Sequence, residues 1–127
     1  EKYDICPYGT EAMHVLRAEK GFIIVGQETD GTVTPHDLGM DWIVSKTKHD
    51  FIGKRALFRS DMLKSDRKQL VGLLNENENE VIPEGSQIVE MLQPSPPMAM
   101  IGHITSSYYS PNCNRSIAMA LIKGGKA

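Results

Sequence analysis

LVGLL, residues 70–74, is the first of four short apolar runs in the second half of this 127-residue sequence. The other three cover residues 87–92, 101–105 and 117–122, and turn-forming or charged residues separate them. Runs of this length, bounded by turn residues, are typical of β-strands that pair with their neighbours. The sequence therefore predicts antiparallel β structure from about residue 69 onward.

The segments between these runs have the chemistry of turns. Residues 75–80 read NENENE, residues 83–85 read PEG, and residues 93–97 read QPSPP. Proline has no N–H to donate to a sheet, so the last segment is too proline-rich for a central strand. We interpret all three as loops and the acidic run as a solvated turn.

The first half of the chain begins with a helical signal. Thr10 is a candidate N-cap, Glu11 adds a carboxylate to the first turn, and Gly21 stands where a helix commonly ends in left-handed geometry. These residues predict a helix from about residue 10 to residue 20. Beyond it, the apolar stretches at 22–25 and 40–44 each predict a short strand.

A second helix and a connector complete the predicted elements. Residues 50–57 read DFIGKRAL and lead into a helix that we expect to end near Lys64. A charged stretch then continues to Lys68. The whole pattern predicts an α+β chain that is mostly β.

Glu19 is the most informative single residue, because it extends an apolar stripe. Ala12, Val15 and Leu16 share one predicted helical face, and Glu19 follows them at i+3 and i+4, whereas Arg17 falls on another side. A carboxylate in such a place needs hydrogen-bond donors. Two interpretations remain open: a glutamate that turns to water or pairs with a nearby base, Lys20 or Arg55, or an acceptor for a ligand's amidine-like edge.

Trp42 and two lysines are further candidates. Trp42 is the only tryptophan, and it serves either as a core anchor or as a flat surface for an aromatic ring. Lys46 and Lys48 follow it and are either solvated or placed to meet a carboxylate tail.

Composition excludes several function classes. A net charge of −2 provides no basic field for nucleic acid or anionic membranes. No apolar run approaches the roughly 18 residues that a membrane span needs, and the first residues lack a secretory pattern, so we expect a cytoplasmic protein. The four scattered histidines predict no metal site, and Cys6 and Cys113 are expected to be free thiols.

A set of short motifs in one order resembles a known family. LRAEKG at 16–21, TP at 34–35, LGMDW at 38–42 and DFIGKRAL at 50–57 are similar to the glycine-cleavage T-protein, or aminomethyltransferase, family. LVGL at 70–73, PEG at 83–85, GHITS at 102–106 and SP at 110–111 extend the resemblance over essentially the whole chain. The loop at 93–98 departs from it.

The resemblance implies a domain organisation. Residues 1–50 would complete a preceding folate-binding domain, residues 51–68 would form a helical connector, and residues 69–127 would form a small antiparallel C-terminal β-barrel. If the first part is separated from the rest of its domain, its exposed apolar face predicts self-association.

The resemblance also implies a function. PYGTEAM at 7–13 and PHDLGMDW at 35–42 are most similar to members that belong to flavin-dependent amine oxidases. Such a domain would bind tetrahydrofolate and capture a one-carbon unit as 5,10-methylenetetrahydrofolate. FAD, FMN and NAD would be held elsewhere in the complex, and the partners would be the rest of the same subunit and the other subunits. The alternatives are a segment of a glycine-cleavage aminomethyltransferase and a non-catalytic docking module.

Three residues carry the implied folate site. Glu19 matches the pterin-binding glutamate of an Arg-x-Glu-x-Gly motif, Trp42 matches a position beside the pocket, and Lys48, or Lys46, lies near a basic position that meets the glutamyl tail. The family's catalytic aspartate falls in an earlier segment. The resemblance therefore assigns no catalytic residue to this chain and predicts that the chain alone is inactive.

Overall fold

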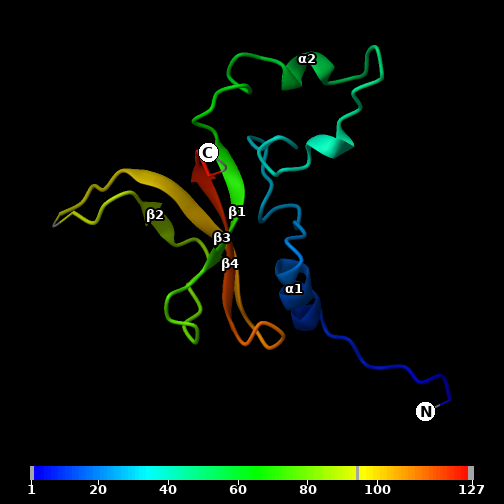
Figure 1. The fold of residues 1–127 in the computed structure, drawn as a ribbon, viewed down its shortest axis with the longest axis vertical. Helices are drawn as coiled ribbons and strands as arrows, with labels where there is room; N and C mark the ends of the chain where they lie inside the picture. Colours follow the sequence, from blue (N-terminus) through cyan, green and yellow to red (C-terminus); the bar gives the residue numbers. More distant parts are fainter. Residues whose placement is uncertain (1, 94, 126–127) are drawn as a thin grey trace.

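A four-stranded antiparallel sheet forms the centre of the computed structural model, which describes residues 2–93 and 95–125 (Figure 1). Its strands are β1 (Lys68–Leu74), β2 (Gln87–Val89), β3 (Met100–Ser110) and β4 (Arg115–Lys123), in the order β1-β4-β3-β2. Each predicted apolar run contributes to one strand, and every pairing is antiparallel. The predicted α+β, mostly β, class is confirmed.

The sheet is open within the described residues. β1 pairs only with β4, and β2 pairs only with β3, so that these two strands form the edges among residues 2–93 and 95–125. β2 is three residues long and contains a register shift against β3. The expected barrel is thus present here as an unclosed, curved sheet.

β4 is buried on both faces because each face carries its own apolar cluster. On one face, Ile117 and Met119 pack against Ala18 of the helix α1 (Thr10–Glu19). On the other face, Ala118 and Ala120 pack against Ile104. This double coverage explains why residues 116–121 are a continuous buried run rather than an alternating one.

α1 ends as the sequence predicts, but it begins differently. Gly21 has φ of +70°, its N–H donates to the Ala18 carbonyl, and the Phe22 N–H donates to the Arg17 carbonyl. This double hydrogen bond is the Schellman arrangement that terminates helices. The N-cap is Gly9 and not Thr10, since Thr10 already lies in the first turn and no side-chain cap is formed.

The buried face of α1 was predicted wrongly. Arg17 and Ala18 are buried, whereas Ala12 is exposed and Leu16 keeps 41% of its surface accessible. The helix turns toward the sheet the side that carries Arg17, because a buried carboxylate from another segment pairs with it there. Periodicity identified the helix but not its orientation.

Residues 20–67 are irregular, and three of their predicted elements differ. Residues 22–25 form no strand, only an isolated bridge between Val25 and Thr29, because no neighbouring strand pairs with them. Residues 40–44 contain the 3-10 helix η1 (Asp41–Ile43), which follows a chain of turns closed at Gly39. The second helix is shortened to α2 (Lys54–Leu57) and does not reach Lys64.

The loops agree with their predicted character. Residues 76–80 are exposed, and the connection from residue 90 to residue 99 contains no strand where it is described. Within the predicted loop 93–97, Pro94 lies outside the described residues, as do residues 1, 126 and 127 of the predicted domain ranges. No helix in the described ranges is long and apolar enough to cross a membrane.

Candidate functional site

The Glu19 carboxylate is fixed at the end of α1 by residues from the turn between β3 and β4. The Ser110 hydroxyl donates to Oε1, and the Asn112 amide donates to Oε2 at 2.8 Å. Neither Lys20 nor Arg55 forms an ion pair with Glu19 among the described contacts. The donors that the sequence argument required are thus supplied by a segment more than ninety residues away.

These contacts keep Glu19 ionised and leave it with spare acceptor capacity. The hydrogen bonds from Ser110 and then Asn112, with the nearby Lys20 charge, hold the pKa of this carboxyl below its ordinary value against the opposing effect of burial. An ionised carboxylate has about four lone-pair sites, and the two protein donors use one on each oxygen. Glu19 can therefore accept two more N–H groups, one on each oxygen.

Glu19 lines a groove of about 600 Å³ between the end of α1 and the sheet. The walls from β1 and β4 are apolar and include Leu70, Leu73, Ile117 and Met119. A single oriented carboxylate beside such walls suits a flat ring with polar donors on one edge.

A second carboxylate lies deeper and was missed by the sequence reasoning. Glu28 has no exposed surface, and its Oε2 lies 2.9 Å from Nη1 of Arg17, which is 7% exposed. Burial would raise the pKa of Glu28, but hydrogen bonds from the Ser106 hydroxyl and the Ile24 N–H, together with Arg17, hold it below the ordinary value. Both oxygens of Glu28 and both terminal nitrogens of Arg17 have partners inside the protein, whereas the buried Nε of Arg17 has none among the described residues.

Arg17 connects four segments through this pair. Its Nη2 donates to Ser106 on β3 at 2.6 Å and to Gln27 at 2.8 Å, and its Nη1 donates to the carbonyl of Phe22 at 3.2 Å. The Ser106 hydroxyl in turn donates a hydrogen bond to Oε1 of Glu28. The arginine of the Arg-x-Glu motif therefore holds α1 on the sheet, while the glutamate of that motif faces the groove. The signal that could have found this role is the polar turn at residues 27–30, which follows the apolar run 22–25 after the helix.

Trp42 and Lys48 lie away from Glu19. Trp42 is in η1 and is 78% exposed, so the core-anchor interpretation is wrong. Lys48 is exposed and borders a separate cavity of about 320 Å³ with Val44 and Phe51. Lys46 borders a third cavity. The described residues do not bring the three predicted site residues into one cavity.

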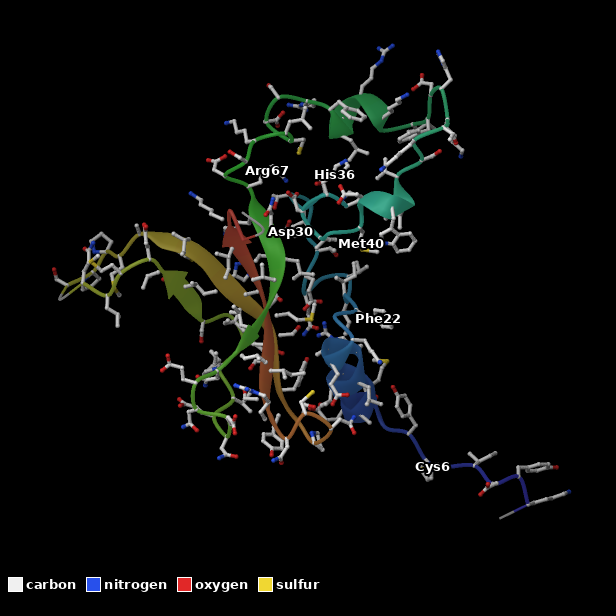
Figure 2. The ribbon with its side chains drawn as sticks, viewed as in Figure 1. Cys6, Phe22, Asp30, His36, Met40 and Arg67 are labelled. Carbon is white, nitrogen blue, oxygen red and sulfur yellow. The ribbon has the colours of Figure 1, made fainter. Side chains whose placement is uncertain are left out.

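The remaining candidate ligands are dispersed. Cys6 and Cys113 are both free and exposed, with Cys6 on the extended N-terminal tail (Figure 2) and Cys113 in the β3–β4 turn. Within residues 2–93 and 95–125, no group of three histidine, cysteine, aspartate or glutamate side chains could hold a metal ion.

Comparison with protein families agrees with this architecture. The GCVT N-terminal domain model matches residues 1–48, and the glycine cleavage T-protein C-terminal barrel domain model matches residues 68–127. The second match begins at Lys68, the first residue of β1, and residues 49–67 lie between the two matches. The chain belongs to the glycine cleavage T-protein family, as the sequence motifs predicted.

Within the family, the chain is similar to a subunit of an oxidase. It is 52% identical to sarcosine oxidase subunit alpha of Corynebacterium sp. (strain P-1) over 100% of the chain and 13% of that subunit. It is 50% identical to the corresponding subunit of Corynebacterium sp. (strain U-96), over 99% of the chain and again 13% of the subunit. Identity to an aminomethyltransferase of Clostridium botulinum (strain Langeland / NCTC 10281 / Type F) is 35%, over 92% of the chain and 30% of the enzyme. The chain thus spans a minor part of the relatives it matches, and it corresponds to a segment of a sarcosine oxidase alpha subunit.

Proposed function

We propose that this chain forms part of the tetrahydrofolate site in a sarcosine oxidase. The intact protein would oxidise sarcosine, and the folate would take up the released one-carbon unit as 5,10-methylenetetrahydrofolate. Electron transfer would use FAD, FMN and NAD bound outside this segment. The partners would be the remainder of the alpha subunit and the other oxidase subunits, in the cytoplasm. Support comes from similarity over 99–100% of this chain, and 13% of each subunit, to two such alpha subunits.

The observation that carries the proposal is the oriented carboxylate of Glu19 in an apolar groove. The aminopyrimidinone edge of a reduced pterin presents two adjacent N–H donors, and Glu19 has one free acceptor site on each oxygen. The leucine and isoleucine walls of the groove would contact the faces of the ring. Glu19 would thus orient the pterin, and no chemical step is assigned to it.

We also include Trp42 and Lys48 in the proposed folate site. The exposed indole of Trp42 would support an aromatic part of the folate, and the ammonium of Lys48, or of Lys46, would meet the carboxylates of its glutamyl tail. We also propose that residues 1–50, 51–68 and 69–127 are the end of the folate domain, a connector and the C-terminal unit. The start of β1 at Lys68 supports the last boundary.

The test is calorimetric titration of tetrahydrofolate into the intact protein under anaerobic conditions. Glu19→Ala should weaken binding by about 30-fold or more, because a charge-assisted contact to the ring is lost. Glu11→Ala is the matched control, since Glu11 is an exposed glutamate in the first turn of the same helix. Equal binding by both variants would contradict the proposed site.

An aminomethyltransferase is the second candidate, and the 35% identity to such an enzyme favours it. Both candidates use the same folate contact, so the titration does not separate them. An amino-terminal dinucleotide-binding region in the same reading frame, with sarcosine-dependent reduction of bound flavin, would support the oxidase. Glycine-cleavage activity without flavin would support the transferase.

A docking role without folate is the third candidate, and the exposed apolar side chains near α1 favour it. Phe22 lies beside the end of α1 (Figure 2), and Val25 is 86% exposed. This candidate predicts no folate binding by the intact, folded protein. It shares with the first two the expectation that the separated chain is inactive and self-associates, which size-exclusion chromatography would test.

A further inference from the structure

The end of β3 and the turn that follows it contact α1 at the Glu19 carboxylate. Ser110 is the last residue of β3 and is fully buried, and Asn112 lies two residues further along in the turn. The two side chains contact different oxygens of Glu19. The C-terminal sheet therefore touches the candidate ligand-binding group directly.

When Glu19 is ionised, the direction of each hydrogen bond around the Ser110 hydroxyl can be assigned. The Ser110 hydroxyl oxygen accepts the N–H of Cys113 at 2.9 Å, so the turn itself fixes the oxygen. The hydroxyl has a single proton, and that proton is directed to Oε1 of Glu19. The amide nitrogen of Asn112 only donates, and it donates to Oε2. With Glu19 ionised, both of its oxygens therefore act as acceptors in these contacts.

We propose that Ser110 and Asn112 are positioning residues that hold Glu19 as an ionised, two-sided acceptor. The groove would then select rings that present two adjacent N–H donors and reject rings that present an acceptor at either place. This inference rests on the proposed folate site, and it goes beyond that proposal by assigning part of the ligand recognition to the C-terminal sheet. Ligand binding and the order of the β3–β4 turn are coupled through the same carboxylate.

The titratable groups around Glu19 are few. Lys20 is next to it on α1, and Cys113 from the turn lines the same groove. The groove residues contributed by β1 and β4 carry no titratable group. In Ser110→Ala, a change in the acid limb of ligand binding therefore reports on Glu19 itself, once the titration of the ligand is cancelled by comparing variants. In Asn112→Asp, the added carboxylate titrates with Glu19 as a coupled pair, and the acid limb reports on that pair.

The experiment measures the Kd of tetrahydrofolate against pH for the intact protein and its variants. Asn112→Asp replaces a donor by a carboxylate next to Glu19, and Ser110→Ala removes the hydroxyl donor. Each substitution should raise the pH below which binding weakens. For Asn112→Asp we expect a rise of about one pH unit, which corresponds to an increase of about tenfold in Kd below that pH. Gln93→Glu is the control, because it adds the same charge at an exposed position in the β2–β3 connection, on the far side of the sheet from α1 (Figure 1).

The outcomes separate this inference from the folate site. An upward shift in both variants and none in Gln93→Glu supports the positioning role. Unchanged pH profiles in Asn112→Asp and Ser110→Ala, with binding still lost in Glu19→Ala, overturn the positioning role and leave the folate site in place. Unchanged binding in Glu19→Ala overturns the folate site. Because Asn112 is exposed, its variant is expected to fold even if Ser110→Ala is destabilised.

Discussion

The sheet and the irregular segment 20–67 are held together by different kinds of interaction. β1, β4 and β3 form long antiparallel ladders with an apolar cluster on each face of β4. The segment 20–67 has no ladder of its own among the described residues. The Arg17–Glu28 pair connects it to α1, and the Arg67–Asp37 pair joins two parts of the segment, with Arg67 immediately before β1 (Figure 2). One region therefore depends on area and shape, and the other on charge.

The Arg67–Asp37 pair resembles the Arg17–Glu28 pair, because in both a buried carboxylate is held by an arginine and further donors. The Asp37 side chain is 4% exposed and accepts hydrogen bonds from two nitrogens of Arg67. Nη2 lies 2.6 Å from Oδ2, and Nε lies 2.9 Å from Oδ1. Thr34 adds its N–H and its hydroxyl, each at 2.8 Å. A buried carboxylate is stable only while such donors remain, so each pair is sensitive to the loss of one member. Apolar contacts are lost more gradually.

The largest expected effect is in the charged region. Glu28→Ala removes the partner of a buried arginine, and breaking a buried pair from one side costs about 3–5 kcal/mol because the other charge is left uncompensated. Urea unfolding followed by circular dichroism should report this loss. Glu11→Ala, which changes an exposed glutamate, should stay within about 0.5 kcal/mol of the parent protein. Similar stabilities for the two variants would show that the pair does not hold the segment.

The sheet should respond to shape instead. A Cβ at Gly102 would lie 2.4 Å from the Leu121 carbonyl oxygen and 3.0 Å from the Ile122 Cα, so the backbone of β4 would have to move. Gly102→Ala should therefore cost about 2–3 kcal/mol, as overpacking does. Gly72→Ala is the matched control in β1, where an added Cβ meets nothing within 4 Å. If both glycines tolerate alanine equally, close strand packing is not what limits the sheet.

A smaller effect is expected where the two regions meet, at the end of α1. Gly21 has φ of +70° and open space around its Cβ position, so Gly21→Ala would introduce backbone strain without a clash. The expected cost is about 1 kcal/mol. Gly31→Ala is the control, because Gly31 has no positive φ and an added Cβ there meets nothing within 4 Å, so this variant should not lose stability. Thermal unfolding of the two variants would measure the difference, and equal midpoints would argue against the left-handed cap.

The sheet was predictable from the sequence because each strand carries its own signal. The runs around residues 71 and 119 are apolar, short and bounded by turns, and a neighbouring strand was available for each of them. The apolar run at residues 22–25 has the same local signal and yet forms no strand. The local sequence does not show which other strand a run will pair with, and a run becomes a strand only where a neighbouring strand is present.

The candidate site was predictable only in part. The helix and its glutamate followed from periodicity and from the family motif, and Glu19 indeed borders a groove. Ser110 and Asn112 could not be inferred, because their contact with Glu19 depends on how a turn after β3 packs on a helix. Arg17 was assigned to the wrong side, because a charged residue gives no apolar signal even when a buried carboxylate makes its burial favourable. Polar contacts between distant segments are the information that pattern reasoning lacks.

The smallest expected effect on overall stability is that of acid pH, which should weaken the segment 20–67 but not the sheet. The folded-state pKa values of Glu28 and Asp37 are both lowered. Burial opposes this, and it is outweighed at Glu28 by hydrogen bonds from Ser106, Ile24 and then Arg17, and at Asp37 by hydrogen bonds from Arg67 and then Thr34. The stabilisation from each is complete above its unfolded pKa, near 4, and is lost as the pH falls through the lower folded pKa. The N–H groups of Ile24 and Thr34 donate directly to these carboxylates, so their hydrogen exchange should accelerate at acid pH while amides in β4 stay protected.

Asp37→Asn is the control for this prediction. It should remove the acid response at Thr34 and leave the one at Ile24. A uniform loss of protection across the sheet and the segment would contradict the division into two regions.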